Sequence, residues 1–132
     1  MSCLLDTHAL LWSLFEPNRL GSTALKLLQD PQQTVYVSVI TVWEISLKYS
    51  IGKLDLQGVT PDAFPDLILQ TGFELLPLTA LEAATFHNLP KLEHKDPFDR
   101  LLIWQAISRK LSFVSQDTAC SKYHTFGLKV VW

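Results

Sequence analysis

Four acidic residues of this sequence stand against apolar runs, where an ionised carboxylate is costly. They are Asp6, Glu44, Asp99 and Asp117. Burying several carboxylates without partners is unfavourable because each loses its hydration and because they repel one another. A hard divalent cation such as Mg²⁺ or Mn²⁺ takes oxygen ligands and would offset that cost. The residue types and their surroundings therefore predict a carboxylate-lined metal pocket.

Three of these acids also have a purely structural interpretation. The run Asp96-Pro97-Phe98-Asp99 has the pattern of a helix N-cap, a proline at the first helical position and an acid in the first turn. Asp96 is therefore expected to cap a helix, while both roles stay open for Asp99. Asp117 precedes Thr118 and fits a cap equally well. Asp6 could hold a turn, but its position at the end of an apolar run favours a functional role.

Glu44 is the acid that is hardest to explain structurally. It lies between Trp43 and Ile45 on a predicted helix that is apolar nearly all round, so it has little solvent-facing surface to occupy. Lys48, one turn later, could pair with it. That ion pair is the main structural alternative to metal binding.

Short apolar runs alternate along the chain with helical patterns. Strands are expected at residues 3–6, 35–37, 73–76, 112–115 and 128–131, and helices at about 9–15, 22–29, 39–51, 61–70, 79–88 and 97–110, with a short turn at 118–123. The strand runs lack clean alternation, as expected when helices cover both faces of a sheet. The pattern predicts an α/β fold, a three-layer sandwich with a central parallel sheet of about five strands flanked by helices.

The predicted sheet places the acids at one edge. Ligands of such sheets bind beyond the carboxyl ends of the strands. Asp6 ends the first predicted strand and Asp117 follows the fourth, while Glu44 and Asp99 fall in the first turns of their helices. We therefore expect the four carboxylates to converge in one cation-sized site.

Length and charge limit the possible functions. With 132 residues, of which 48% are hydrophobic, the chain suits one compact domain, residues 1–132. A net charge of −2 and a pI near 6.0 argue weakly against a nucleic-acid partner. With four of the 13 acids in a metal pocket, however, 11 basic residues face nine remaining acids, so the objection loses force.

Cysteine usage and targeting signals point to the cytoplasm. Cys3 and Cys120 are too few and too far apart for a disulfide framework or a zinc site, so we expect both to be buried in a reducing compartment. The N-terminus lacks a basic region before its apolar run, and the apolar stretches are too short for a membrane span. We expect a cytoplasmic protein without a membrane partner.

Four segments together resemble a PIN domain. They are DTHALLW at 6–12, TVWEI at 41–45, HKDPFDRLL at 94–102 and SQD at 115–117. More narrowly, the chain resembles the VapC-type toxin ribonucleases of prokaryotic toxin–antitoxin modules. The resemblance runs through the whole chain in the same order, and the segment 94–102 is its most specific part.

The resemblance implies that Asp6, Glu44, Asp99 and Asp117 are the catalytic metal ligands. Residues expected beside these ligands are Thr7, Asp96 and Ser115, with Ser38 as a further candidate hydroxyl. Lys48, Lys95 and Arg100 could face an RNA backbone, although for Arg100 a structural contact with the acidic pocket or its own helix is favoured. His8, His94 and the four tryptophans, Trp12, Trp43, Trp104 and Trp132, are expected to pack or cap rather than to contact RNA.

The expected function is a Mg²⁺- or Mn²⁺-dependent endoribonuclease, the toxin of a type II toxin–antitoxin system. It would hydrolyse RNA phosphodiester bonds with a metal-activated water. The resemblance implies a homodimer and a cognate antitoxin protein, with DNA bound only through the antitoxin. The alternative is a catalytically silent α/β domain that binds metal or protein; a receiver-like version would need a phosphorylatable Asp and a following Lys, an arrangement that is not evident.

Overall fold

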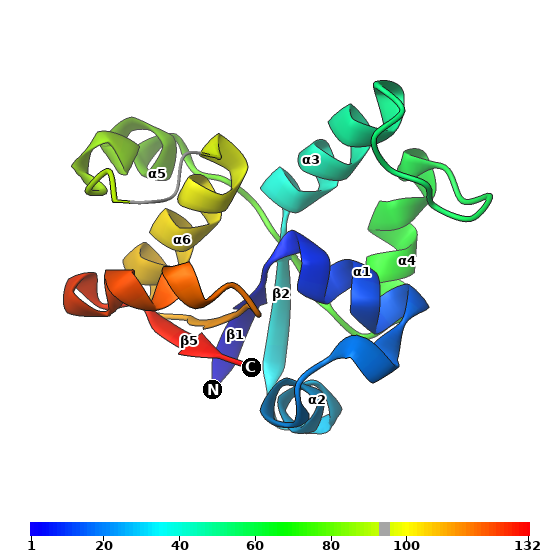
Figure 1. Ribbon diagram of the computed structural model, residues 1–132, viewed down its shortest axis with the longest axis horizontal. Helices are drawn as coiled ribbons and strands as arrows, with labels where there is room; N and C mark the ends of the chain where they lie inside the picture. Colours follow the sequence, from blue (N-terminus) through cyan, green and yellow to red (C-terminus); the bar gives the residue numbers. More distant parts are fainter. Residues whose placement is uncertain (93–95) are drawn as a thin grey trace.

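The computed structural model describes residues 1–92 and 96–132 and has three layers, with helices on both sides of a sheet (Figure 1). Its strands are β1 (Ser2–Leu5), β2 (Thr34–Ser38), β3 (Glu74–Leu76), β4 (Ser112–Val114) and β5 (Lys129–Val131). All pairs are parallel, in the order β3-β2-β1-β4-β5. The predicted α/β sandwich with a five-stranded parallel sheet is confirmed. Because β1 is central, the residue that follows it lies in the middle of the carboxyl edge.

The helices follow the predicted order, but two expected helices are divided, a turn at 17–19 is additional and the turn expected at 118–123 extends to residue 126. They are α1 (Thr7–Phe15), α2 (Ser22–Gln29), α3 (Val39–Ser50), α4 (Phe64–Gln70), α5 (Ala80–Thr85) and α6 (Pro97–Arg109), with 3₁₀ helices η1 (Pro17–Arg19), η2 (Pro61–Ala63), η3 (Phe86–Asn88) and η4 (Thr118–Phe126). The expected helix at 61–70 is divided because Pro65 has no N–H to donate to a preceding turn, and an α-helix begins anew at Phe64. The expected helix at 79–88 tightens into a 3₁₀ turn at its end, as helices often do.

The two faces of the sheet carry separate hydrophobic cores. Successive side chains of a strand point to opposite faces, so Cys3 and Leu5 pack with α1, α2 and α4 while Leu4 packs with α6 and η4. Both cysteines are buried, as expected. Among the described residues, no helix combines the length and the apolar character needed to cross a membrane.

A buried polar network ties α5 and α6 to the start of α3. Ser38 Oγ donates to Gln105 Oε1 at 2.6 Å, and Gln105 Nε2 donates to Glu82 Oε1 at 3.4 Å. Arg109 donates to the same carboxylate from Nε at 2.7 Å and from Nη2 at 2.9 Å. Ser38 also caps α3. The network therefore sets how α6 lies against α3, the two helices that carry predicted site acids.

Acid should weaken the fold through Glu82. The hydrogen bond from the Arg109 guanidinium holds the pKa of Glu82 at about 2, below its ordinary value of 4.5. Since the folded-state pKa is the lower one, the ionised pair stabilises the protein at neutral pH by on the order of 3 kcal/mol. That contribution is lost as the pH falls from about 4.5 to about 2.

The test is the unfolding free energy in urea as a function of pH. Glu82→Gln should flatten its fall between about pH 5 and pH 2, whereas Glu74→Gln, at an exposed site on β3, should keep the native slope. A native slope in Glu82→Gln would mean that other carboxyl groups carry the acid sensitivity.

Candidate active site

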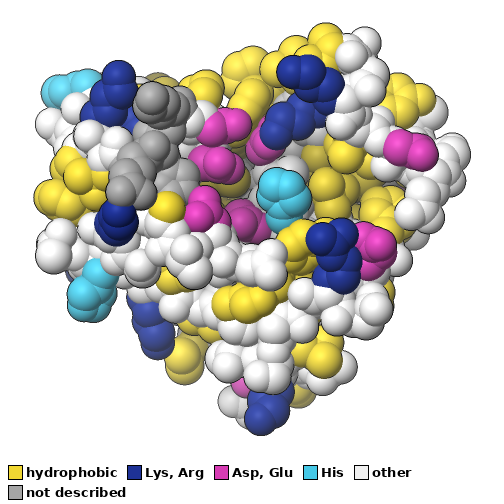
Figure 2. Space-filling view, in the orientation of Figure 1, with side chains coloured by type: hydrophobic (Ala, Val, Ile, Leu, Met, Phe, Trp, Pro, Cys, Tyr) yellow, Lys and Arg dark blue, Asp and Glu magenta, His cyan; other side chains and the backbone are white. Residues whose placement is uncertain are grey.

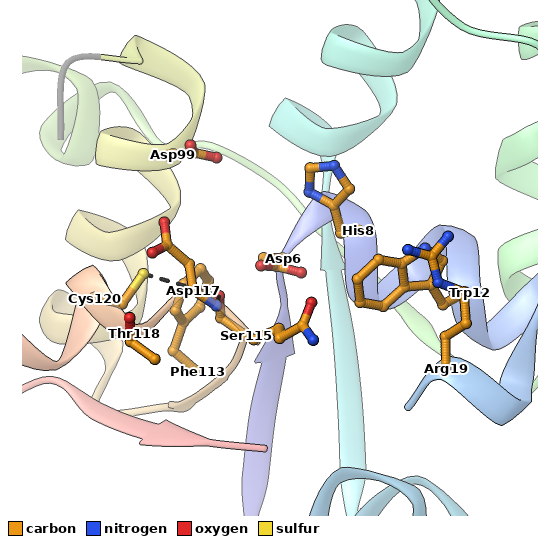
Figure 3. A pocket seen from close by; sticks show the side chains of 11 residues that line it. Asp6, His8, Trp12, Arg19, Asp99, Phe113, Ser115, Asp117, Thr118 and Cys120 are labelled. Carbon is orange, nitrogen blue, oxygen red and sulfur yellow. Dashed lines mark hydrogen bonds between the residues drawn. The ribbon is translucent and has the colours of Figure 1, made fainter. Parts of the chain in front are cut away.

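A pocket of about 670 Å³ opens at the carboxyl ends of β1 and β4, and three of the predicted acids line it. Asp6 follows β1, Asp117 follows β4 and Asp99 lies in the first turn of α6. Figure 2 shows acidic side chains gathered in the central hollow of this face, and Figure 3 shows Asp99 and Asp117 on the same side of Asp6. Three segments far apart in the sequence thus bring carboxylates into one pocket.

Asp6 is the most buried of these three acids, with 9% of its surface exposed. Its Oδ1 accepts a hydrogen bond from Ala9 N at 2.7 Å and caps α1. Burial raises the pKa of Asp6, and the charge of Glu44 raises it further, against hydrogen bonds from Ser115 and Ala9 and the charge of His8. The protein groups thus leave part of the cost of ionising Asp6 uncompensated, and a cation beside it would favour the charged form.

Ser115 connects two of the acids. It hydrogen-bonds Asp6, and its Oγ accepts from Asp117 N at 3.1 Å. Asp117 itself caps η4 by accepting from Ala119 N at 3.0 Å. The structural and the functional interpretations of Asp117 are therefore compatible, because the cap holds its carboxyl group at the pocket.

Asp96 caps α6, as expected. Its Oδ1 accepts from Phe98 N at 2.8 Å and from Asp99 N at 3.3 Å. The residues that line the pocket include Asp99 and exclude Asp96. The role of Asp96 at the site is to fix the helix start that presents Asp99.

Glu44 lies in an adjoining pocket of about 290 Å³. Only 2% of its surface is exposed. Its Oε1 accepts from Thr7 Oγ1 at 2.6 Å and its Oε2 accepts from Lys48 Nζ. The predicted alternative, an ion pair with Lys48, is thus present, although Glu44 remains close enough to raise the pKa of Asp6.

The structure therefore differs from the expected convergence of all four carboxylates. Over residues 1–92 and 96–132, no three His, Cys, Asp or Glu side chains are arranged so that they could hold one ion as they stand. Lys48 supplies the counterion of Glu44 and explains its separate position. The donor set of the larger pocket, carboxylate oxygens with the Ser115 hydroxyl, still suits a hard divalent cation.

The basic residues expected to face RNA are placed differently from one another. Lys48 is engaged by Glu44: burial disfavours its charge, but the hydrogen bond to Glu44 prevails and raises the pKa of Lys48. Arg100 turns away from the pocket, donating from Nη2 to Leu89 O at 3.2 Å with its guanidinium 4.8 Å from the Phe86 ring centre. It braces the segment after α5. Lys95, like His94, lies outside the described residues.

Cys120 also lines the larger pocket. Burial raises the pKa of its thiol to about 12, so the thiol stays protonated at neutral pH and is a poor nucleophile.

Among the lining residues that sequence reasoning did not place at the site are Trp12 and Arg19. Trp12 was expected in a core or interface. Arg19 lies at the pocket because α1 ends at Phe15 and the chain turns at η1, which begins at Pro17. The Glu16-Pro17 pair was the available signal, since a proline directly after a helical pattern marks a change of chain direction.

Comparisons with known proteins agree with this fold. Similar folds occur in the structures of VapBC2 from Rickettsia felis (17% identity, TM-score 0.68, covering 99% of this chain and 98% of that chain), FitAcB from Neisseria gonorrhoeae (21%, 0.64, 100% and 97%) and a toxin–antitoxin complex from Klebsiella pneumoniae (19%, 0.60, 98% and 96%). No curated protein sequence matches. The family model of the PIN domain matches residues 3–124, which include Asp6, Glu44, Asp99 and Asp117. A match over nearly the whole sequence, with the same fold in three solved structures, shows that this chain belongs to the PIN domain family.

Proposed function

We propose that this chain, as a single domain of residues 1–132, is a metal-dependent endoribonuclease and the toxin of a type II toxin–antitoxin pair. The observation that carries the proposal is the buried carboxylate of Asp6, which shares an open pocket with Asp99 and Asp117 at the carboxyl edge of the sheet. Membership of the PIN family supports nuclease chemistry. A metal ion bound by Asp6 would offset the cost of burying its carboxylate.

Asp6, Asp99 and Asp117 would hold Mg²⁺ or Mn²⁺ through carboxylate oxygens. When bound, such an ion would lower the pKa of an attacking water and stabilise charge on the phosphoryl and leaving oxygens. Ser115 fixes Asp6 relative to Asp117 through its two hydrogen bonds. We assign Glu44 to the same site, oriented by Thr7 and in competition with Lys48.

The structural relatives support a protein partner. The Rickettsia felis structure is a VapBC2 complex bound to a DNA fragment from its promoter, and the Klebsiella pneumoniae structure is a toxin–antitoxin complex. By analogy, we propose that this chain forms a homodimer and binds a cognate antitoxin, which would carry the DNA-binding activity. The net charge of −2 favours leaving DNA contacts to that partner.

Mapping of RNA ends tests the reaction. Brief induction of the native chain in bacteria should arrest growth and create new cellular RNA ends with 5′-phosphate and 3′-hydroxyl groups. These ends are expected because water attacks phosphorus and the 2′-hydroxyl takes no part.

Two results would contradict the proposal in different ways. New ends with 2′,3′-cyclic phosphates would identify the 2′-hydroxyl as the nucleophile and exclude the hydrolytic mechanism. Growth arrest without any new RNA ends would favour the alternative of a silent domain that binds metal or protein.

A further inference from the structure

The active-site pocket has a second wall of different character. His8, Trp12 and Arg19 line it together with the acids. Figure 3 shows these three residues on the side of Asp6 opposite Asp99 and Asp117. The pocket therefore runs from two carboxylates, past Asp6, to a cation mounted on an aromatic ring.

Arg19 is held at this wall by two neighbours. Its guanidinium carbon lies 4.3 Å from the Trp12 ring centre, and its Nη1 donates to Glu16 Oε2 at 3.1 Å. Trp12 is itself supported, since its ring lies 5.7 Å from those of His8 and Trp132. Although Arg19 is exposed, its position is thus defined before any ligand arrives.

These contacts stabilise the fold only slightly. An exposed cation–π pair and an exposed ion pair such as Arg19–Glu16 each contribute little to the free energy of unfolding. A stacked guanidinium keeps N–H donors at its rim, and these match the oxygens of a phosphate group. The arrangement suits anion binding better than it suits stability.

A phosphodiester strand lying in this pocket would need such a cation. The strand is negative, and the wall formed by Asp99 and Asp117 repels every phosphate that a metal ion does not neutralise. Arg19 offers the positive charge at the other end of the same pocket. The Arg19 guanidinium covers one face of Trp12, so that face is not open for base stacking. The groups available to a ligand are the N–H donors of Arg19, which bind anions.

We propose that Arg19, mounted on Trp12, binds the RNA phosphate next to the one that is cleaved and so positions the strand across Asp6. This inference rests on the proposed ribonuclease function and assigns a substrate-positioning residue to the same site. Lys48, Lys95 and Arg100 were the sequence-based candidates for the RNA backbone; of these, Lys48 is paired with the buried Glu44 and Arg100 donates to Leu89 O.

Arg19→Gln tests the inference, with Lys26→Gln as the matched control. Both changes remove one exposed positive charge, but Lys26 lies on α2 and does not line the pocket. For cleavage of cellular RNA, Arg19→Gln should raise KM about tenfold with kcat nearly unchanged, and Lys26→Gln should alter neither. The melting temperatures of both variants should stay close to that of the native chain.

The salt dependence of RNA binding gives a second measurement, which would not change if the role of Arg19 were only structural. Binding of a short mixed-sequence single-stranded RNA is measured in an Asp6→Asn background, so that the RNA stays intact. Arg19→Gln should reduce the slope of log K against log salt by about 0.7, the value for one contact to a single strand. Arg19→Lys should restore the slope but only part of the affinity, since lysine keeps the charge and loses the planar stack.

The outcomes separate this inference from the proposed function. Equal KM values and slopes for Arg19→Gln and Lys26→Gln, with a native chain that cleaves RNA, would overturn the role of Arg19 and leave the ribonuclease standing. A fall in kcat at constant KM would also overturn it, because it would place Arg19 in the chemistry. A native chain that neither binds nor cleaves RNA would overturn both.

Discussion

Asp6→Asn should abolish RNA cleavage while leaving the fold intact, or slightly more stable, in EDTA. Loss of a group that merely supports a metal ligand costs about 10–100-fold in activity, so loss of a ligand should cost more than about a hundredfold. The fold should survive because asparagine is as good an N-cap as aspartate, and its Oδ1 can keep the hydrogen bond from Ala9 N. Removing a charge whose burial is unfavourable also relieves strain on the folded state.

Thermal unfolding with and without Mg²⁺ is the measurement that identifies ligands. A cation that binds only the folded chain stabilises it by mass action, by about 2.7 kcal/mol at a concentration of 100 Kd. Mg²⁺ should therefore raise the melting temperature of the native chain and of the control Asp66→Asn, which alters an exposed acid on α4. The rise should be much smaller in Asp6→Asn and Asp99→Asn.

Equal responses to Mg²⁺ in all four proteins would refute the assigned ligands. Growth arrest that persists in Asp6→Asn would instead mean that the chain acts by binding alone. The two results are independent, because one measures metal affinity in the purified protein and the other measures activity in the cell.

The fold was predictable because its strands are buried on both faces. Runs such as Cys3-Leu4-Leu5 place consecutive side chains in two different cores, and only a sheet covered on both sides accommodates that pattern. Most boundaries moved by one or two residues, the turn expected at 118–123 extends to Phe126, and two helices are divided. The first division follows from Pro65, a residue that sequence reasoning passed over at that point.

Topology was also sufficient to place three of the acids. Asp6 directly follows β1 and Asp117 is the third residue after β4, and because these parallel strands pair with each other, both acids had to share an edge. Asp99 followed from the cap that Asp96 provides. Glu44 was expected to join them, although pairing with Lys48 was compatible with the same helix face. The structure has that ion pair and places Glu44 in the adjoining pocket.

Contacts across long sequence separations were beyond the reach of local patterns. Gln105 and Ser38 satisfy each other's buried polar groups although 67 positions separate them, and nothing near either residue indicates the partner. Arg100 and Arg19 make the same point for charge. Arg100 was a candidate for RNA contact, but it braces the segment after α5. Arg19 was not a candidate, but it lines the pocket.

Lys48→Met should destabilise the protein in EDTA and enlarge its stabilisation by Mg²⁺. Glu44 is 2% exposed and would lose the partner of its Oε2. Removing one member of a buried ion pair costs about 3–5 kcal/mol, and we expect roughly 1–3 kcal/mol here because water can reach the Lys48 end. If Glu44 belongs to the metal site, Mg²⁺ takes over the role of the missing ammonium group and restores the lost stability.

Melting temperatures over a series of Mg²⁺ concentrations distinguish the two roles of Glu44. Lys53→Met is the control, since Lys53 lines the same smaller pocket and its loss removes the same charge while leaving the Glu44–Lys48 pair in place. A metal ligand at Glu44 requires the Mg²⁺-dependent rise to be larger in Lys48→Met than in the native chain and in Lys53→Met. If the three rises are equal, Glu44 is the structural partner of Lys48, and the cation is held by Asp6, Asp99 and Asp117 alone.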